Sequence, residues 1–154
     1  MQKKLKLKIV TPEKVILEEE VEQVSIPTVL GEITVLPDHI PLVTELSSGD
    51  VVATADGEHV PMAVVGGFVE VKSTQNENGK QTEVAVLADF AEHVSNISED
   101  AIEKAKERAI LLKKQMDNRD EVDFEHFEAE LERSLTRVKI ADKWKNRKYR
   151  KSTN

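Results

Sequence analysis

The sequence contains no cysteine, few aromatic residues and no long apolar run. Without cysteine, the chain can form neither a disulfide nor a thiolate metal site, and it has no cysteine nucleophile. Leucines near the start of the chain alternate with lysines, whereas a signal peptide requires a continuous apolar stretch. No segment reaches the roughly 18 to 20 apolar residues that a membrane-spanning helix requires. If the protein works at a membrane, we therefore expect a partner to hold it there, without direct insertion into the lipid.

Charged residues are abundant, and their balance is acidic. They make up 33% of the 154 residues, and the formal net charge is −7. This composition favours solubility and argues against a general nucleic-acid-binding protein, which would carry a basic surface. The length is suited to one domain, or to one small domain with an appendage.

Apolar residues alternate with polar ones over most of the first 88 residues. From Lys4 to Ile9, for example, lysine alternates with leucine or isoleucine, and later segments repeat the pattern with valine and isoleucine. This period of two, rich in β-branched residues, is typical of β-strands. Glycine, asparagine, aspartate and proline separate these segments at short intervals. Many short strands with this spacing predict an antiparallel β-sandwich or a flattened barrel.

The period becomes helical after Asp89. Apolar residues then recur at spacings of three and four in two stripes separated by a polar break at 117–120: Ile97, Ala101, Ala105, Ala109, Leu112 and Met116, then Phe124, Phe127, Leu131, Leu135, Val138 and Ala141. The stripes predict an antiparallel helical hairpin, with Ser98 as the N-cap of its first helix. Because alanine buries little area, we expect a marginal hairpin that leans on the β domain or on a partner. The predicted fold class is α+β, with a β domain at residues 1–89 and the helical hairpin at 90–154.

Two prolines restrict the backbone of one loop in the first half of the chain. Pro37 and Pro41 fix φ and remove two hydrogen-bond donors, and Asp38 and His39 lie between them. A loop held in one shape by its own sequence is suited to presenting side chains to a partner.

Four segments resemble, in order, motifs of the epsilon subunit of rotary ATP synthases. Residues 31–42 (Gly-Glu-Ile-Thr-Val-Leu-Pro-Asp-His-Ile-Pro-Leu) resemble the family's Gly-Glu-Leu-Gly-Ile-Leu-Pro-Gly-His-x-Pro-Leu segment. Residues 10–13 resemble its first strand and turn, residues 66–71 its Ser-Gly-Gly-Phe-x-Glu-Val segment, and residues 84–88 the strand that ends its sandwich. A helical hairpin of the expected length follows, so the resemblance covers nearly the whole chain.

This resemblance implies a fold, a role and a set of partners. Members of the family have a sandwich of ten strands in two sheets and a C-terminal helix pair, and they perform no chemistry. They lie on the central stalk of the ATP synthase, where they contact the gamma subunit and the ring of c subunits. In bacteria, the helix pair can extend into the catalytic head of alpha and beta subunits and block ATP hydrolysis. The resemblance therefore implies a peripheral subunit at the cytoplasmic face of the bacterial plasma membrane, which couples proton-driven ring rotation to ATP synthesis.

The resemblance also selects Glu32, Pro37, His39 and Pro41 as contacts with the c ring and gamma. Glu32 and His39 would make charge-assisted contacts at a wet interface, and the prolines would reduce the entropy lost on docking. The alternative is that Glu32 is an ordinary strand residue and that His39 only caps a turn.

The second helix and the residues after it are basic, although the protein is acidic. By resemblance, four cations are candidates for contact with an acidic loop of the catalytic head: Arg133, Arg137, Lys139 and Lys143. A solvated basic end that favours the helix dipole is the alternative. Because Trp144 and Tyr149 interleave with cations, the same pattern would also suit single-stranded nucleic acid or an anionic membrane surface, although neither has a defined pocket here.

Some members of the family bind ATP through an Ile/Leu-Asp-x-x-Arg-Ala motif at the start of the first helix. The matching positions keep Ile97, but Ser98, Ala101 and Ile102 replace the Asp, the Arg and the Ala. Arg108, Arg133 and Arg137 match positions where ATP-binding members carry basic residues, yet the loss of the motif's Arg removes a fixed cation. We therefore expect little or no ATP affinity and no cofactor.

The sequence shows no catalytic or metal-binding constellation. Its four histidines are scattered, and the helical ligand spacing of Asp123 and His126 does not fill a zinc site. There is no nucleophile-elbow motif.

The leading hypothesis is a non-catalytic rotor subunit whose hairpin acts as a movable brake on ATP hydrolysis. The alternatives are a free-standing β-sandwich adaptor whose hairpin binds another helical protein and, third, a nucleic-acid binder that uses the basic end.

Overall fold

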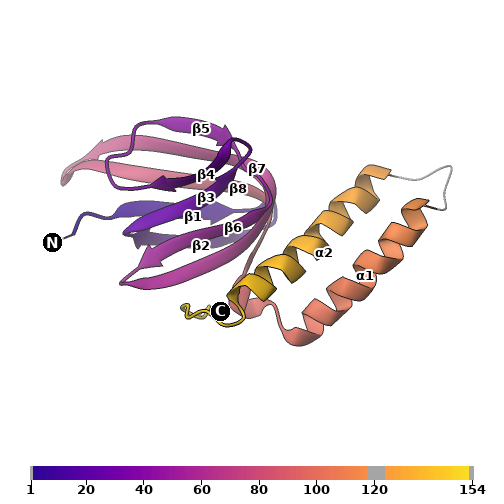
Figure 1. Ribbon diagram of the computed structural model, residues 1–154. Helices are drawn as coiled ribbons and strands as arrows, with labels where there is room; N and C mark the ends of the chain where they lie inside the picture. Colours follow the sequence, from indigo (N-terminus) through magenta and orange to yellow (C-terminus); the bar gives the residue numbers. More distant parts are fainter. Residues whose placement is uncertain (1, 118–123, 153–154) are drawn as a thin grey trace.

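A computed structural model describes residues 2–117 and 124–152, which form a β-sandwich followed by two antiparallel helices (Figure 1). The strands are β1 (Leu5–Val10), β2 (Val15–Val21), β3 (Gln23–Thr28), β4 (Gly31–Val35), β5 (Leu42–Glu45), β6 (Gly49–Ala55), β7 (Glu58–Asn76) and β8 (Gly79–His93). After them come a short 3₁₀ helix, η1 (Val94–Asn96), and the helices α1 (Glu99–Asp117) and α2 (Phe124–Trp144). The α+β fold class predicted from the sequence is confirmed.

The apolar residues of the alternating pattern lie on the inner faces of the sandwich, and the polar residues lie on its outer faces. In β1, Leu5, Leu7 and Ile9 are fully buried, whereas Lys6 and Lys8 are exposed. Side chains of a strand point alternately to its two faces, so one face of β1 enters the core and the other meets solvent. The remaining strands contribute mainly valine, isoleucine and alanine to the same core. Each fully buried large apolar side chain stabilises the fold by roughly 1.5–3 kcal/mol.

The long strands β7 and β8 belong to both layers of the sandwich. The first half of β7 pairs with β6, and its second half pairs with β5. β8 pairs with β1 over residues 83–87 and then continues beside the first half of β7. One layer therefore has the order β4-β3-β6-β7-β8, and the other has the order β2-β1-β8-β7-β5.

Two glycines make the bend at which β7 passes between the layers. Gly66 and Gly67 have φ angles of 61° and 112°, a region that residues with a side chain rarely adopt. A Cβ atom on Gly67 would lie 1.9 Å from the Leu87 carbonyl oxygen of β8, so the approach of the two strands requires glycine. The bend also explains the strand number. The resemblance implied about ten strands, and the described residues form eight because β7 and β8 each supply a segment to both layers.

One strand pair departs from the antiparallel arrangement that the sequence predicted. β1 is antiparallel to β2 but parallel to β8, with Lys6 opposite Glu83. Parallel neighbours cannot be joined by a tight turn, and here the rest of the sandwich connects them. Local alternation holds no information about a pairing between segments so far apart.

The first helix begins and packs as its sequence indicates. The Ser98 hydroxyl accepts a hydrogen bond from the Ala101 amide at 3.1 Å, which is the expected N-cap. Ala105, Ala109 and Leu112 of the predicted stripe are buried. The polar break predicted at 117–120 lies, except for its first residue, outside the described residues.

The stripe predicted for α2 is wrong at Leu135, whose side chain is 53% exposed. The buried residues of α2 are Ser134, Thr136, Ile140, Ala141 and Trp144. This helix packs against both α1 and the sandwich, so its buried surface is wider than a single apolar stripe. Small side chains such as Ser134 let neighbouring backbones approach closely, whereas Leu135 lies on the exposed part of the helix surface.

A second apolar cluster joins the helices to the sandwich. It contains Ala63 of β7, Val94 and Ile97 of the connecting segment, and Ile140, Ala141 and Trp144 of α2. The expectation that the hairpin leans on the β domain is therefore confirmed. The boundary expected after residue 89 falls inside β8, because this strand continues to His93.

Candidate functional site

The loop between β4 and β5 is held in place by hydrogen bonds as well as by its prolines. The Asp38 amide donates to the buried Thr82 hydroxyl at 2.7 Å, and Lys3 Nζ lies 2.6 Å from Asp38 Oδ1. The His39 amide donates to the Leu36 carbonyl at 3.1 Å and closes a turn. These contacts attach the loop to β8 and to the residues before β1, so its shape exists before any partner arrives.

This loop presents apolar surface beside its histidine. Ile40 is 74% exposed, and Pro41 next to it is also exposed, while Pro37 is half-buried. The His39 ring is half-buried, and its Nδ1 lies 2.6 Å from the Ile40 carbonyl oxygen. Glu32 is exposed on β4, and among the described residues no hydrogen bond joins it to His39. The loop therefore groups Pro37, His39 and Pro41, whereas Glu32 belongs to the adjoining strand.

An apolar strip is exposed on the outer face of the sandwich, and it was not predicted from the sequence. Phe68 of β7 lies opposite Leu87 of β8, and Val43 of β5 lies opposite Glu70, two residues further along β7. Residues opposite one another, or two apart on a strand, point to the same face, so Val43, Phe68 and Leu87 share this face. All three are at least half exposed. Each also has an apolar neighbour on the buried face, and this local loss of alternation is the signal that could have revealed them.

Two of the candidate cations on α2 contact the end of β8. Arg137 Nε donates to Glu92 Oε2 at 2.9 Å, and its guanidinium lies 4.8 Å from the centre of the Phe90 ring. Arg133 lies over the same ring at 5.6 Å. Lys139 is exposed. In this position of the hairpin, both arginines contact the sandwich, while Arg133 remains exposed and Arg137 is partly exposed.

Asp50, which is 7% exposed, connects the end of α2 to the start of β6. Lys143 Nζ lies 2.8 Å from Asp50 Oδ2, and the Trp144 ring nitrogen Nε1 donates to the same oxygen at 2.8 Å. The Trp144 ring also packs edge-on against His59, with ring centres 5.9 Å apart. The sequence analysis did not select Asp50, because the partners of Asp50 lie 93 and 94 positions further along the chain.

The positions that replace the nucleotide-binding motif have structural roles. Ser98 caps α1, while Ala101 and Ile102 pack against the apolar cluster between the helices and the sandwich. Arg108 pairs across the hairpin with Glu130, with Nε–Oε1 and Nη2–Oε2 distances of 2.6 and 3.2 Å. This hydrogen bond lowers the pKa of the Glu130 carboxyl.

The described residues contain no group of three or more histidine, aspartate and glutamate side chains placed to hold a metal ion. Asp123, part of the one helical ligand spacing in the sequence, lies outside the described residues. No helix in the part of the chain that the structure describes is long and apolar enough to cross a membrane. The described surface features that could contact a partner are the loop between β4 and β5, the apolar strip of Val43, Phe68 and Leu87, and the basic end of α2.

Comparison with protein families identifies relatives of both parts of the chain. The sequence model of the ATP synthase delta/epsilon chain, beta-sandwich domain, matches residues 4–94. The ATP synthase epsilon chain of Nitratidesulfovibrio vulgaris is 38% identical over 140 residues, which cover 91% of this chain and 97% of that protein. The epsilon chain of Desulforamulus reducens is 36% identical over 143 residues, which cover 92% of this chain and all of that protein.

Two solved structures with a similar fold belong to mitochondrial enzymes. A chain in the cryo-EM structure of the Euglena gracilis mitochondrial ATP synthase matches with a TM-score of 0.60 at 22% identity, over 92% of this chain and 79% of that one. A chain in the central stalk and c-ring of the Tetrahymena thermophila enzyme matches with a TM-score of 0.52 at 16% identity, over 93% of this chain and 98% of that one. At these identities, the likeness concerns the fold.

Proposed function

The chain belongs to the family of ATP synthase epsilon chains, and from this premise we propose that it is the non-catalytic epsilon subunit of a central stalk. The observation that carries the proposal is the extent of the match: the two relatives align over 97% and 100% of their own lengths, through the sandwich and the helices alike. In this role the chain couples rotation of a proton-driven c ring to ATP synthesis in the catalytic head.

We assign the contacts with the rotor to the sandwich. The loop carrying Pro37, His39 and Pro41, together with Glu32 on the adjoining strand, would contact the c ring and gamma. Because the loop is already held by hydrogen bonds, docking would cost little further ordering. The apolar strip of Val43, Phe68 and Leu87 would pack against gamma, since contiguous exposed apolar surface is typical of protein interfaces.

The helical hairpin would act as the regulatory part. In the folded position, the cations of α2 are paired with the sandwich: Arg137 with Glu92, and Lys143 with Asp50. In an extended position, Arg133, Arg137, Lys139 and Lys143 would exchange these partners for acidic side chains of the alpha/beta head. The brake would then depend on the difference in free energy between two sets of ion pairs and on the apolar cluster under α2.

This function places the chain at the cytoplasmic face of a bacterial plasma membrane, as a peripheral part of the complex. Its attachment would depend on gamma and the c ring. The sandwich and the hairpin would serve as separate functional units, one binding the rotor and the other regulating hydrolysis.

Co-purification tests the proposal and its interface together. A tagged full-length chain should capture the gamma, c and beta subunits from a detergent extract. Phe68→Asp should reduce the amount of captured gamma by roughly tenfold or more. The new carboxylate would be buried at the centre of an apolar contact without a partner for its charge.

The matched control is Leu135→Asp, which places the same charge at a similarly exposed position on α2. This variant should capture gamma as the unchanged chain does. Capture of an unrelated helical protein without gamma would contradict the proposal and would favour the adaptor alternative.

A further inference from the structure

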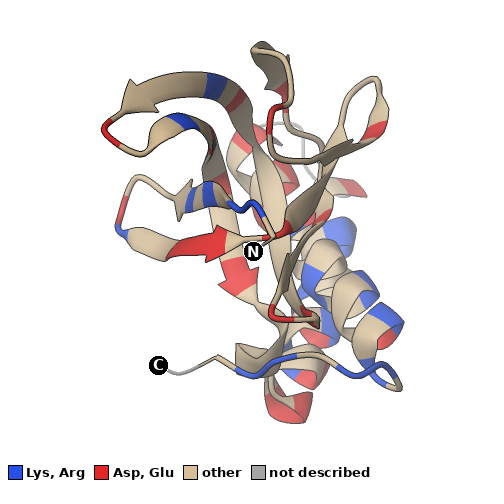
Figure 2. Ribbon diagram, turned by 90° about the vertical axis from the view of Figure 1, so that its left-hand side faces the viewer, with Lys and Arg blue, Asp and Glu red and all other residues tan. Residues whose placement is uncertain are grey.

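The residues that follow α2 turn back onto the sandwich. The Lys145 amide donates to the Asp142 carbonyl at 3.3 Å, and the Arg147 amide donates to the Trp144 carbonyl at 3.2 Å, so the chain reverses after the helix. Residues 145–152, here called the tail, then run beside the sandwich (Figure 1). Figure 2 shows basic residues along the tail and acidic residues on the strands of the sandwich.

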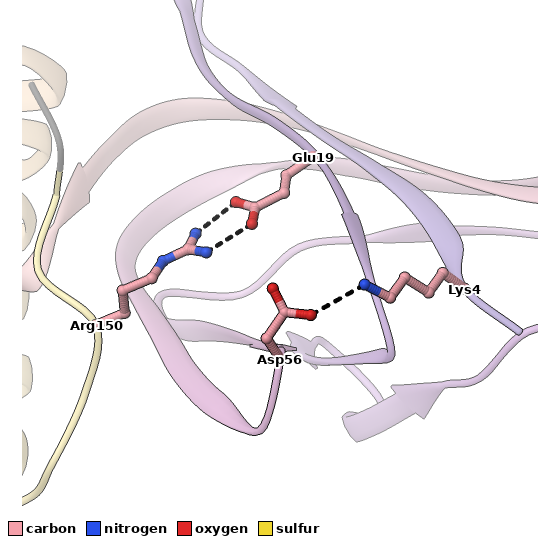
Figure 3. Close-up of polar contacts among 4 residues, drawn as sticks. All are labelled: Lys4, Glu19, Asp56 and Arg150. Atoms are coloured by element: carbon pink, nitrogen blue, oxygen red, sulfur yellow. Dashed lines mark hydrogen bonds and ion pairs between the residues drawn. The ribbon is translucent and has the colours of Figure 1, made fainter. Parts of the chain in front are cut away.

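Arg150 attaches the tail to β2 and to β7. Its Nη1 and Nη2 atoms donate to the two carboxylate oxygens of Glu19 at 2.6 and 2.5 Å, a bidentate pair that Figure 3 shows face to face. Its backbone amide donates to the His59 carbonyl at 2.8 Å. Both the side chain and the backbone of one tail residue are therefore bound to the sandwich.

Two neighbours of Arg150 add contacts on the helical side. The Tyr149 ring packs edge-on against Trp144 with ring centres 5.9 Å apart, and lies 6.2 Å from the ring of His93. The Ser152 amide donates to Ser95 Oγ at 2.9 Å. The tail thus bridges the sandwich, the connecting segment and the end of α2.

The position of Glu19 explains why an arginine is suited to this contact. Glu19 lies two residues from Leu17 and Val21 on β2, so it shares their face, which packs against the core. Its side chain is 27% exposed, and a carboxylate at the margin of a core is costly without a partner. Arg150 satisfies both of its oxygens.

The surrounding charge also favours a cation at this point. Hydrogen bonding and attraction by Glu19 raise the pKa of Arg150, and the negative charges of Glu58 and Asp56 raise it further. Asp56 itself pairs with Lys4, with an Nζ–Oδ1 distance of 3.1 Å (Figure 3). The tail is therefore the basic partner of an acidic corner of the sandwich.

We propose that the tail is a clasp, a segment that binds the sandwich within the same chain and holds the helical hairpin in its folded position. Tyr149 covers Trp144, which lies at the end of α2 and in the cluster under it, so α2 cannot lift away while Arg150 stays on Glu19. Release of the tail thus precedes release of the hairpin.

The clasp is tested on the isolated full-length chain with a double-mutant cycle. Arg150→Gln and Glu19→Gln should each raise the amide hydrogen exchange rate of Ser152 by roughly five- to tenfold, and the double variant should be no faster than either. Acrylamide quenching of Trp144, the single tryptophan of the chain, should increase in the same variants. Raising the salt concentration should act in the same direction, because the ion pair is partly exposed.

Lys148→Gln is the matched control, since it removes one positive charge from an exposed position of the same segment. It should change neither measurement. If the effects of the Arg150 and Glu19 substitutions on the Ser152 exchange rate were additive in the double variant, the two side chains would act independently. That result would overturn the role assigned to their ion pair. Faster Ser152 exchange with unchanged Trp144 quenching would show a docked tail that does not restrain the hairpin, and would overturn the clasp.

The consequence for regulation rests on the proposed function, whereas the clasp itself does not. In a reconstituted ATP synthase, Arg150→Gln should strengthen inhibition of hydrolysis, because the hairpin is freer to extend. Failure of the unchanged chain to assemble into the enzyme would refute the proposed function. The result for the clasp, measured on the isolated chain, would be unaffected. Normal assembly with unchanged hydrolysis would refute only the regulatory consequence.

Discussion

At the residue scale, the carboxylate of Asp50 binds two side chains at the end of α2. It receives the Trp144 indole N–H and the Lys143 ammonium, and it is itself nearly buried. Asp50→Ala would leave a buried indole donor without a partner, so we expect the free energy of unfolding to fall by about 2 kcal/mol. Urea denaturation followed by tryptophan fluorescence measures the change.

Asp142→Ala is the control for this experiment, because Asp142 is an exposed carboxylate on α2, the helix that carries both partners of Asp50. It should change the free energy of unfolding by less than about 0.5 kcal/mol. Equal effects of the two substitutions would mean that the Asp50 contacts contribute nothing beyond ordinary surface charge.

His93 makes stability depend on pH. Burial lowers the pKa of His93, and the nearby positive charge of Arg150 lowers it further, although the Arg150 backbone acts in the opposite direction. Nδ1 accepts a hydrogen bond from the Ser95 amide at 3.0 Å, an arrangement that the neutral ring provides. The unfolded chain therefore binds more protons than the folded chain between the lowered pKa and about 6.5, so stability should fall as the pH drops below about 6.5.

His93→Asn tests this dependence while keeping an acceptor for the Ser95 amide. The variant should lose part of the pH dependence of the urea midpoint between about pH 5.5 and 7. A steep slope that survives His93→Asn would assign the effect to another group.

Sequence reasoning reached some of these residues and not others, for a physical reason. Ser98 was predicted as a cap because its partner lies three residues away. Asp50 and Glu19 were not selected, because their partners lie 94 and 131 positions away in the chain. A local pattern identifies local contacts, and the pairing of distant charges depends on how the elements pack.

At the scale of elements, the bend in β7 depends on the absence of a side chain at Gly67. Gly67→Ala would place a methyl group against the Leu87 carbonyl and would add strain at φ 112°. Gly31→Ala meets comparable strain, at φ 115°, but has no atom within 4 Å of the new Cβ. We expect the first substitution to destabilise the chain by at least about 2 kcal/mol more than the second, measured by thermal or urea unfolding.

The difference between the two variants isolates the steric contact from the backbone strain, because both share the same backbone region. Similar stabilities of the two variants would show that β7 and β8 separate easily at the bend. In that case the close approach would not be what joins the two layers.

The elements themselves were largely predictable, but their connections were not. The alternation of lysine with leucine and isoleucine predicted β1, and the change of period after Asp89 predicted the helices. The parallel pairing of β1 with β8 and the exposure of Leu135 were missed. Both depend on which neighbours an element finds in the folded chain, and its own sequence does not specify them.

At the scale of the whole molecule, removal of the hairpin tests its proposed regulatory role. Because β8 extends to His93, a chain cut after Asn96 retains every strand, whereas a cut after Ala88 would remove a paired segment. In a reconstituted ATP synthase, the chain cut after Asn96 should assemble normally and should raise the rate of ATP hydrolysis. Hydrolysis assays, with the amount of bound chain measured by gel, give the comparison.

Unchanged hydrolysis in the fully assembled enzyme would refute the brake in this protein and leave the rotor role intact. Loss of assembly would instead indicate that the helices contribute to binding of the rotor. The two outcomes are separated by measuring the bound chain and the rate in the same preparation.

The continuity of β7 and β8 has a mechanical consequence. Where two sheets touch only through side chains, a sideways force on one can make it slip over the other. Here the same backbone passes from sheet to sheet at Gly66 and Gly67, so such a force is carried by covalent bonds as well as by packing. For a component that turns with a shaft, this construction transmits torque with little internal slip.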